Sequence, residues 1–209
     1  MSSKNMPRKL VILDIDQTLI HSLLRKDPKL DPAFTIDIRG DKYFIYKRNF
    51  LKQFIQGLQG MLSPDFKVAI WTAAQRNYAI KIMDKIWPAW RDELLFLRSS
   101  GHCTTLPTGE IVKDMTILPQ GYDTILVDDN SSNFQINTVN NFSVWKIAPF
   151  THASIDSELK QVLKYITDCK THSVPFAVRP KTPSRLKSIK LPSRKSSLTH
   201  NPHKRPHTA

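Results

Sequence analysis

The chain has 209 residues, with 31 lysines and arginines against 18 aspartates and glutamates, and a formal net charge of +13. Its 40% hydrophobic and 23% charged residues are typical of a soluble protein with one substantial core or two small ones. Two cysteines are too few for a disulfide framework, and no stretch of about 18 apolar residues predicts a membrane span. The N-terminus lacks the pattern of a secretory signal. We therefore expect an intracellular protein, nuclear or cytoplasmic, with no membrane partner.

The positive charge is concentrated at the C-terminal end. Residues 172–209 contain nine lysines and arginines, no acid and six of the fourteen prolines. Frequent proline and little apolar area do not favour a folded core. We predict a disordered N-terminus at residues 1–8, a globular domain at 9–171 and a disordered basic tail at 172–209. Three roles fit the tail: weak electrostatic binding of nucleic acid or an acidic protein, nuclear localisation, or plain solvation.

Short apolar runs and segments of helical periodicity alternate along the domain. In chain order we predict a strand at Lys9–Leu13, a hairpin at Phe34–Asp37 and Tyr43–Tyr46, a helix at Phe50–Leu58, a strand at Lys67–Trp71, a helix at Gln75–Ile86, strands at Asp123–Val127 and Asn141–Ile147, and a closing helix at Ser154–Asp168 with Ile155 on its apolar stripe. Strands separated by helices favour an α/β fold with a parallel sheet covered on both faces.

Polar side chains follow three of these strands. Asp14 and Asp16 come after the first, Thr72 after the second, and Asp128 and Asp129 after the third. The carboxyl edge of a parallel sheet is where ligands bind, so we expect these residues to share one cleft. Clustered carboxylates repel one another without a cation, and hard oxygen ligands suit Mg²⁺. A turn or helix-cap role is the alternative for any single aspartate, but it does not account for two pairs after two strands.

These motifs resemble those of the haloacid-dehalogenase phosphatase superfamily. DIDQT at 14–18 matches its D-x-D-x-T motif, IWTAA at 70–74 its second motif, and ILVDDN at 125–130 its acidic fourth motif. With KRNF at 47–50 and VKD at 112–114, the order and spacing are similar to those of small C-terminal-domain phosphatases. That family is also called the NLI-interacting-factor-like phosphatases. The resemblance implies a Rossmann-like parallel sheet of the haloacid-dehalogenase type.

The resemblance also implies roles for the acids. Asp14 would be the nucleophile that forms an aspartyl-phosphate, and Asp16 the general acid and then base. Mg²⁺ would be bound by Asp14, by the backbone carbonyl of Asp16 and by Asp129. Asp128 would either help to set the metal or bind Lys113.

Three further residues are candidates for substrate binding. By resemblance, Thr72 and Lys113 hold the phosphate group. Arg48 matches a family position that contacts substrate or forms a structural ion pair. From the residues alone, an ordinary solvated role for Lys113 and a helix-capping role for Thr72 are the alternatives.

Little chain is available for a domain that closes over the cleft. Leu19–Phe66 has 48 residues and Ala73–Val112 has 40, and predicted elements already occupy both. We therefore expect a small hairpin insertion, no large cap domain and an open cleft that admits macromolecular phosphomonoesters. The resemblance implies a protein serine/threonine phosphatase, with the RNA polymerase II C-terminal domain as one candidate substrate. The alternatives are a capless polynucleotide-end phosphatase, or a catalytically silent adaptor with a nucleic-acid-binding tail.

Overall fold

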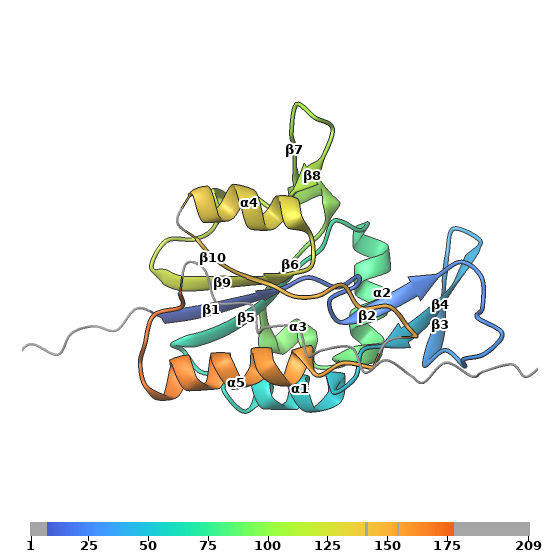
Figure 1. Ribbon diagram of the computed structural model, residues 1–209, viewed down its shortest axis with the longest axis horizontal. Coiled ribbons are helices and arrows are strands. Elements are labelled where there is room, and N and C mark those ends of the chain that lie inside the picture. Colours follow the sequence, from blue (N-terminus) through green and yellow to red (C-terminus); the bar gives the residue numbers. More distant parts are fainter. Residues whose placement is uncertain (1–7, 141, 154, 178–209) are drawn as a thin grey trace, which may run out of the picture.

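A parallel sheet forms the centre of the molecule, which is known from a computed structural model that describes residues 8–140, 142–153 and 155–177. Its five strands have the order β10-β9-β1-β5-β6, and every neighbouring pair is parallel (Figure 1). The strands are β1 (Arg8–Leu13), β5 (Phe66–Trp71), β6 (Leu94–Arg98), β9 (Tyr122–Asp128) and β10 (Ser143–Lys146). The predicted α/β fold is thus confirmed, and β6 is an edge strand that the sequence analysis missed.

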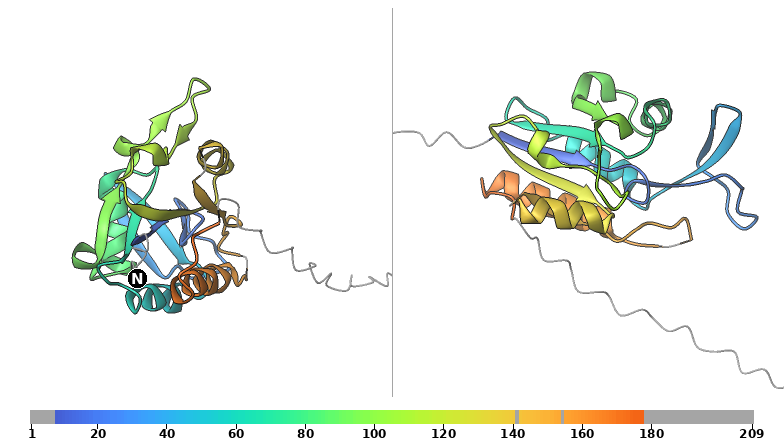
Figure 2. Two further views of the ribbon diagram at one scale, coloured as in Figure 1. Left: turned by 90° about the vertical axis from the view of Figure 1, so that its left-hand side faces the viewer. Right: turned by 90° about the horizontal axis from the view of Figure 1, so that it is seen from above.

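Helices cover both faces of this sheet. One face carries α1 (Leu51–Gln59), α2 (Arg76–Ile86) and α5 (Glu158–Thr171), and the other carries α4 (Ser131–Val139) (Figures 1 and 2). The short helices are α3 (Trp90–Glu93), η1 (Ser100–His102) and η2 (Met115–Ile117). Val11 and Leu13 of β1 pack on the side of α1 and α5, whereas Leu10 and Ile12 pack on the opposite side. This double burial is why β1 is continuously apolar.

Two small antiparallel elements extend from the central sheet. The strands β2 (Ile20–Leu23), β3 (Phe34–Ile38) and β4 (Asp41–Lys47) form a three-stranded sheet of order β2-β4-β3, and β7 (Thr104–Thr105) pairs with β8 (Ile111–Val112). The three-stranded sheet projects beyond the end of the body, as Figure 2 shows from above. The predicted hairpin is therefore β3 and β4 with β2 added. Neither insertion is a large cap within the described part of the chain.

The closing helix begins later than predicted. Helix α5 starts at Glu158 rather than Ser154, and Ile155 is 93% exposed, so its place on the apolar stripe was wrong. The cause is Asp156, whose carboxylate accepts a hydrogen bond from the Glu158 N–H at 3.1 Å and binds the Arg48 guanidinium. Asp156 thus holds the chain outside the helix.

The packed domain continues past residue 171, the predicted boundary. Phe176 is buried, and its N–H donates to Asp123 at 3.0 Å. Lys9 Nζ donates to the Val174 carbonyl at 2.7 Å and forms an ion pair with Asp123. The segment 172–177 therefore belongs to the folded body. The predicted disordered N-terminus of residues 1–8 was wrong at Arg8, which begins β1. The predictions for residues 1–7 and 178–209 lie outside the described residues. No described helix has the length and apolarity to cross a membrane.

Candidate active site

The carboxyl ends of the three central strands meet at one edge of the sheet. Leu13, the last residue of β1, pairs with Ile70 of β5 on one side and with Val127 of β9 on the other. The residues that follow these three positions therefore lie close together at this edge of the sheet. They line a cavity of about 240 Å³. Six of the seven predicted site residues line it: Asp14, Asp16, Thr72, Lys113, Asp128 and Asp129.

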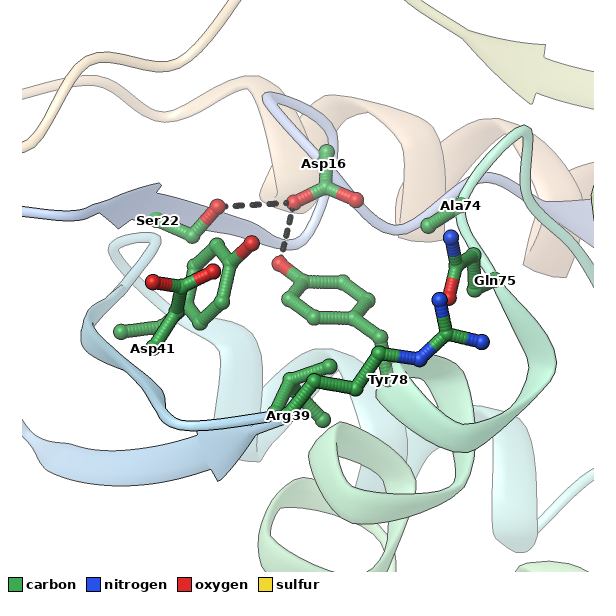
Figure 3. Close-up of a pocket in the computed structure, with 9 residues that line it drawn as sticks. Asp16, Ser22, Arg39, Asp41, Ala74, Gln75 and Tyr78 are labelled. Atoms are coloured by element: carbon green, nitrogen blue, oxygen red, sulfur yellow. Dashed lines mark hydrogen bonds between the residues drawn. The ribbon is translucent and has the colours of Figure 1, made fainter.

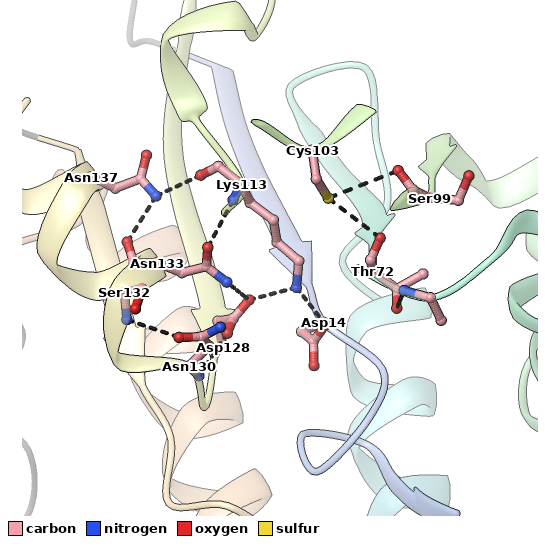
Figure 4. A network of polar contacts seen from close by, with 11 residues as sticks. Asp14, Thr72, Ser99, Cys103, Lys113, Asp128, Asn130, Ser132, Asn133 and Asn137 are labelled. Carbon is pink, nitrogen blue, oxygen red and sulfur yellow. Dashed lines mark hydrogen bonds and ion pairs between the residues drawn. The ribbon is translucent and has the colours of Figure 1, made fainter. Parts of the chain in front are cut away.

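Lys113 lies between two carboxylates at the centre of this cleft. Its ammonium donates to Asp14 and, at 2.6 Å, to Asp128 Oδ2 (Figure 4). Its main chain is fixed by two asparagines of α4: the N–H donates to Asn133 Oδ1, and the carbonyl accepts from Asn137 Nδ2, both at 2.7 Å. Lys113 is only 2% exposed. The alternative of a solvated lysine therefore does not apply.

Asp16 and Thr72 line the cleft on the side of α2. The Thr72 hydroxyl accepts a hydrogen bond from the Ala74 N–H at 3.0 Å, which shapes the turn before α2. It is not the helix N-cap, since that position is Gln75. Asp16 follows the end of β1 in a tight turn, where its carboxylate accepts hydrogen bonds from two side chains outside the central sheet.

The electrostatics of the cleft favour a bound cation. One oxygen from each of Asp14, Asp128 and Asp129 lies within 4.8 Å of the others. Burial is the main cause that raises the pKa of Asp129 to about 6, and the neighbouring charge of Asp128 is the second. Burial is also the main cause that raises the pKa of Asp14 to about 8, although the charge of Lys113 acts to lower it. Burial opposes the charge of Lys113, but Asp14 and Asp128 more than offset it, so its pKa is raised. One ammonium among three carboxylates leaves excess negative charge, and the oxygen donors fit a divalent cation.

The sequence model of the NLI interacting factor-like phosphatases matches residues 9–179. The chain belongs to this family. CTD nuclear envelope phosphatase 1B of Danio rerio is 28% identical to this chain over 139 residues, which cover 61% of this chain and 54% of that protein. Nuclear envelope morphology protein 1 of Schizosaccharomyces pombe is 30% identical over 135 residues, which cover 62% of this chain and 27% of that protein. CTD small phosphatase-like protein 3 of Caenorhabditis elegans is 24% identical over 167 residues, which cover 79% of this chain and 56% of that protein. The chain thus spans about half or less of the length of these relatives.

A solved structure shares the fold of this NLI interacting factor-like phosphatase. It is that of Fcp1, an essential RNA polymerase II CTD phosphatase. The TM-score is 0.50 at 18% identity, and the match covers 79% of this chain and 50% of that one. The likeness confirms the haloacid-dehalogenase type of sheet at the level of the fold.

Arg48 lies outside the cleft of this family member. All three of its guanidinium nitrogens are engaged, by Asp156 and by the backbone carbonyls of Gln17, Thr18 and Ala148, at 2.7 to 3.2 Å. The side chain is fully buried. The structure therefore gives Arg48 the alternative role weighed from the sequence, a structural ion pair, and leaves it no N–H group directed at a substrate.

The residues that hold the predicted ones in place were not among those predicted from the sequence. Asn133 Nδ2 donates to Asp128 Oδ2 at 3.0 Å, and the Asn130 N–H donates to Asp128 Oδ1 at 2.8 Å. The Asn130 side chain accepts from the Ser132 N–H and caps α4. The available signal was Asn130 directly after the two aspartates, a residue type that begins helices. Recognising α4 there would have placed Asn133 in the first turn, beside Asp128.

Proposed function

We propose that this chain is a Mg²⁺-dependent phosphomonoester hydrolase that acts through an aspartyl-phosphate, as a protein serine/threonine phosphatase of the RNA polymerase II C-terminal-domain type. The observation that carries the proposal is the contact of the buried Lys113 ammonium with Asp14, beside Asp128 and Asp129. A carboxylate held by a lysine at the carboxyl edge of the sheet suits a nucleophile for phosphoryl transfer.

Asp14 would attack phosphorus. A bond would form between its carboxylate oxygen and phosphorus as the bond from phosphorus to the leaving oxygen breaks. Lys113 would orient the attacking carboxylate and, with Thr72, stabilise the phosphoryl oxygens as charge develops. Asp128 would hold Lys113 in place, since its Oδ2 accepts from both the ammonium and Asn133.

Three groups would hold the metal: the carboxylates of Asp14 and Asp129 and the backbone carbonyl of Asp16. The family likeness supplies these assignments, and the clustered carboxyl oxygens with their raised pKa values support them. When bound there, Mg²⁺ would lessen the repulsion between an anionic nucleophile and an anionic phosphate.

Asp16 would transfer protons. It would give one to the leaving oxygen in the first step, and in the second take one from the water that hydrolyses the aspartyl-phosphate.

A cysteine mechanism has less support. Burial, first of all, raises the pKa of the Cys103 thiol, and its Sγ lies 3.7 Å from the Thr72 carbonyl oxygen, so a thiolate is disfavoured.

The open cleft supports a macromolecular substrate. The insertions of the described domain are the three-stranded sheet and the β7–β8 hairpin, and neither is a large cap that would close over the cleft. Two of the three relatives are named CTD phosphatases and two carry nuclear envelope names, from which we propose a phosphorylated protein substrate and a nuclear site of action.

A direct comparison of substrates tests the proposal. Release of phosphate is measured from a phosphoserine peptide and from a 3′-phosphorylated oligonucleotide at equal concentration, with Mg²⁺ and with EDTA. We expect Mg²⁺-dependent turnover of the peptide at least about tenfold faster than that of the oligonucleotide. Preference for the oligonucleotide would identify a polynucleotide-end phosphatase instead. Absence of turnover on both would identify a silent adaptor, and Asp14→Asn is the control for contaminating activity.

A further inference from the structure

Asp16 lies where two cavities adjoin. One is the 240 Å³ cleft with Asp14 and Lys113, and the other is a space of about 430 Å³ between α2 and the three-stranded sheet. Among the residues that the structure describes, Asp16 and Ala74 alone line both. Groups that reach Asp16 from the second cavity can therefore control how its carboxylate faces the first.

Two side chains from the second cavity bind the same oxygen of Asp16. The Tyr78 hydroxyl donates to Oδ1 at 2.5 Å, and the Ser22 hydroxyl donates to it at 3.2 Å (Figure 3). The other oxygen points to the side of Ala74 and away from both hydroxyls. Over the described residues, no hydrogen bond to Oδ2 is present. The two oxygens of this carboxylate are thus chemically distinct.

Tyr78 is well placed to hold this arrangement. It lies in the first turn of α2 and is 6% exposed, and its ring packs edge-on against Tyr43 with centroids 5.7 Å apart. A tyrosine hydroxyl carries its proton at neutral pH, so Tyr78 donates this hydrogen bond and Asp16 Oδ1 accepts it. A short hydrogen bond from an immobile phenol fixes the carboxyl orientation.

We propose that Tyr78 is a positioning residue for proton transfer: with Ser22 it occupies Asp16 Oδ1, so that Oδ2 carries the proton that is given to the leaving oxygen. This rests on the proposed general-acid role of Asp16. As the bond from Asp14 to phosphorus forms and the bond to the leaving oxygen breaks, the proton moves from Oδ2 to that oxygen. Asp16 is left as a carboxylate, and its new charge is stabilised by the two hydroxyl donors.

The test compares two substrates whose leaving groups differ in how much they need a proton as they depart. A benzyl alkoxide is a poor leaving group and must be protonated, whereas p-nitrophenolate leaves as a stable anion. We expect Tyr78→Phe to lower kcat/KM for benzyl phosphate by roughly 30-fold and for p-nitrophenyl phosphate by about threefold, because general acid catalysis contributes about 10²- to 10⁴-fold when intact. The ratio kcat/KM reports the step in which the leaving group departs. A purely structural role for Tyr78 would lower both values equally.

Two further variants complete the test. Tyr43→Phe removes a hydroxyl from the adjacent ring without touching Asp16, and both substrates should keep wild-type kcat/KM. Ser22→Ala removes the longer hydrogen bond, so we expect kcat/KM to fall by about threefold for benzyl phosphate alone. This variant provides the test if Tyr78→Phe does not fold. Equal losses for both substrates in Tyr78→Phe or Ser22→Ala would overturn the positioning role alone. A wild-type protein inert on both substrates would overturn the proposed function and the positioning role with it.

Discussion

The ammonium of Lys113 lies 2.6 Å from Asp128 Oδ2, and this ion pair joins the end of β9 to the residue that directly follows β8. The same ammonium contacts Asp14 at the end of β1, so a single charge connects two neighbouring strand ends. Both carboxylates are buried. The cleft is thus arranged around a cation supplied by the chain itself, with Asp129 beside it at the rim.

Replacing this lysine should affect both stability and turnover. Lys113→Met leaves two buried carboxylates without their partner, and we expect a loss of about 3 kcal/mol in the free energy of unfolding measured by urea in EDTA. Turnover of an aryl phosphate should fall at least about 100-fold. The matched control is Lys164→Met, which removes an exposed ion pair with Asp168 and should cost under about 1 kcal/mol. Equal stability of the two variants would contradict the buried ion pair.

Arg48 should behave as a structural residue. Because its guanidinium binds Asp156 and three carbonyls, Arg48→Met should lower the free energy of unfolding by about 3 kcal/mol. KM for a phosphoserine peptide should stay within about threefold of wild type in the folded fraction. Asp156→Ala should cost a similar amount, and the double variant less than the sum. A stable Arg48→Met protein with a greatly raised KM would instead establish substrate contact.

Metal binding should stabilise the fold in a pH-dependent way. Mg²⁺ at about 100 times its dissociation constant adds roughly 2.7 kcal/mol to the native state, which calorimetry detects as a rise in Tm. A carboxyl of raised pKa must lose its proton to bind a cation, and these values are about 8 for Asp14 and about 6 for Asp129. At one fixed Mg²⁺ concentration, the rise in Tm should therefore be larger at about pH 8.5 than at about pH 6.

The control for that measurement is Asp129→Asn. This variant keeps the size of the side chain but removes one charged ligand, so the rise in Tm with Mg²⁺ should shrink at both pH values. If Mg²⁺ left the Tm of the wild type unchanged, or if Asp129→Asn responded as the wild type does, the assignment of this metal site would be wrong.

Phe176 should stabilise the C-terminal end of the described domain. It is 4% exposed, and the ammonium of Lys9 lies 4.4 Å from the centre of its ring. A chain that ends at Ala177 should therefore keep the stability of the full chain. Phe176→Ala in that shortened chain should lose about 3 kcal/mol in urea unfolding, since it leaves a cavity. Equal midpoints for the two would place the domain boundary at residue 171.

The sequence predicted the site better than its surroundings. Asp14 and Asp128 could be placed together because each follows an apolar strand run, and parallel strands deliver their carboxyl ends to one edge. Strand β2 has the sequence IHSL, which lacks a clear alternation, so pairing with β4 rather than local pattern defines it. Edge strand β6 is likewise defined by its neighbour, β5.

The residues that orient the site were beyond local pattern. Tyr78 and Asp16 are 62 positions apart in the sequence, and only the packing of α2 beside the three-stranded sheet brings them together. Arg48 belonged to a recognised motif, yet its role depended on Asp156, 108 positions away. Sequence motifs thus identified residues that line the cleft, whereas long-range packing decided which residues hold them in place.

The proposed mechanism depends on a covalent bond between Asp14 and phosphorus. This bond can be detected by acid quench of a reaction with a phosphoserine peptide, followed by mass spectrometry of the protein. We predict one added phosphoryl group on the peptide that contains Asp14 in the wild type, sensitive to hydroxylamine as an acyl phosphate should be, and none in Asp14→Asn. Turnover by the wild type with no phosphoryl group on Asp14, or with the group on another residue, would rule out Asp14 as the nucleophile.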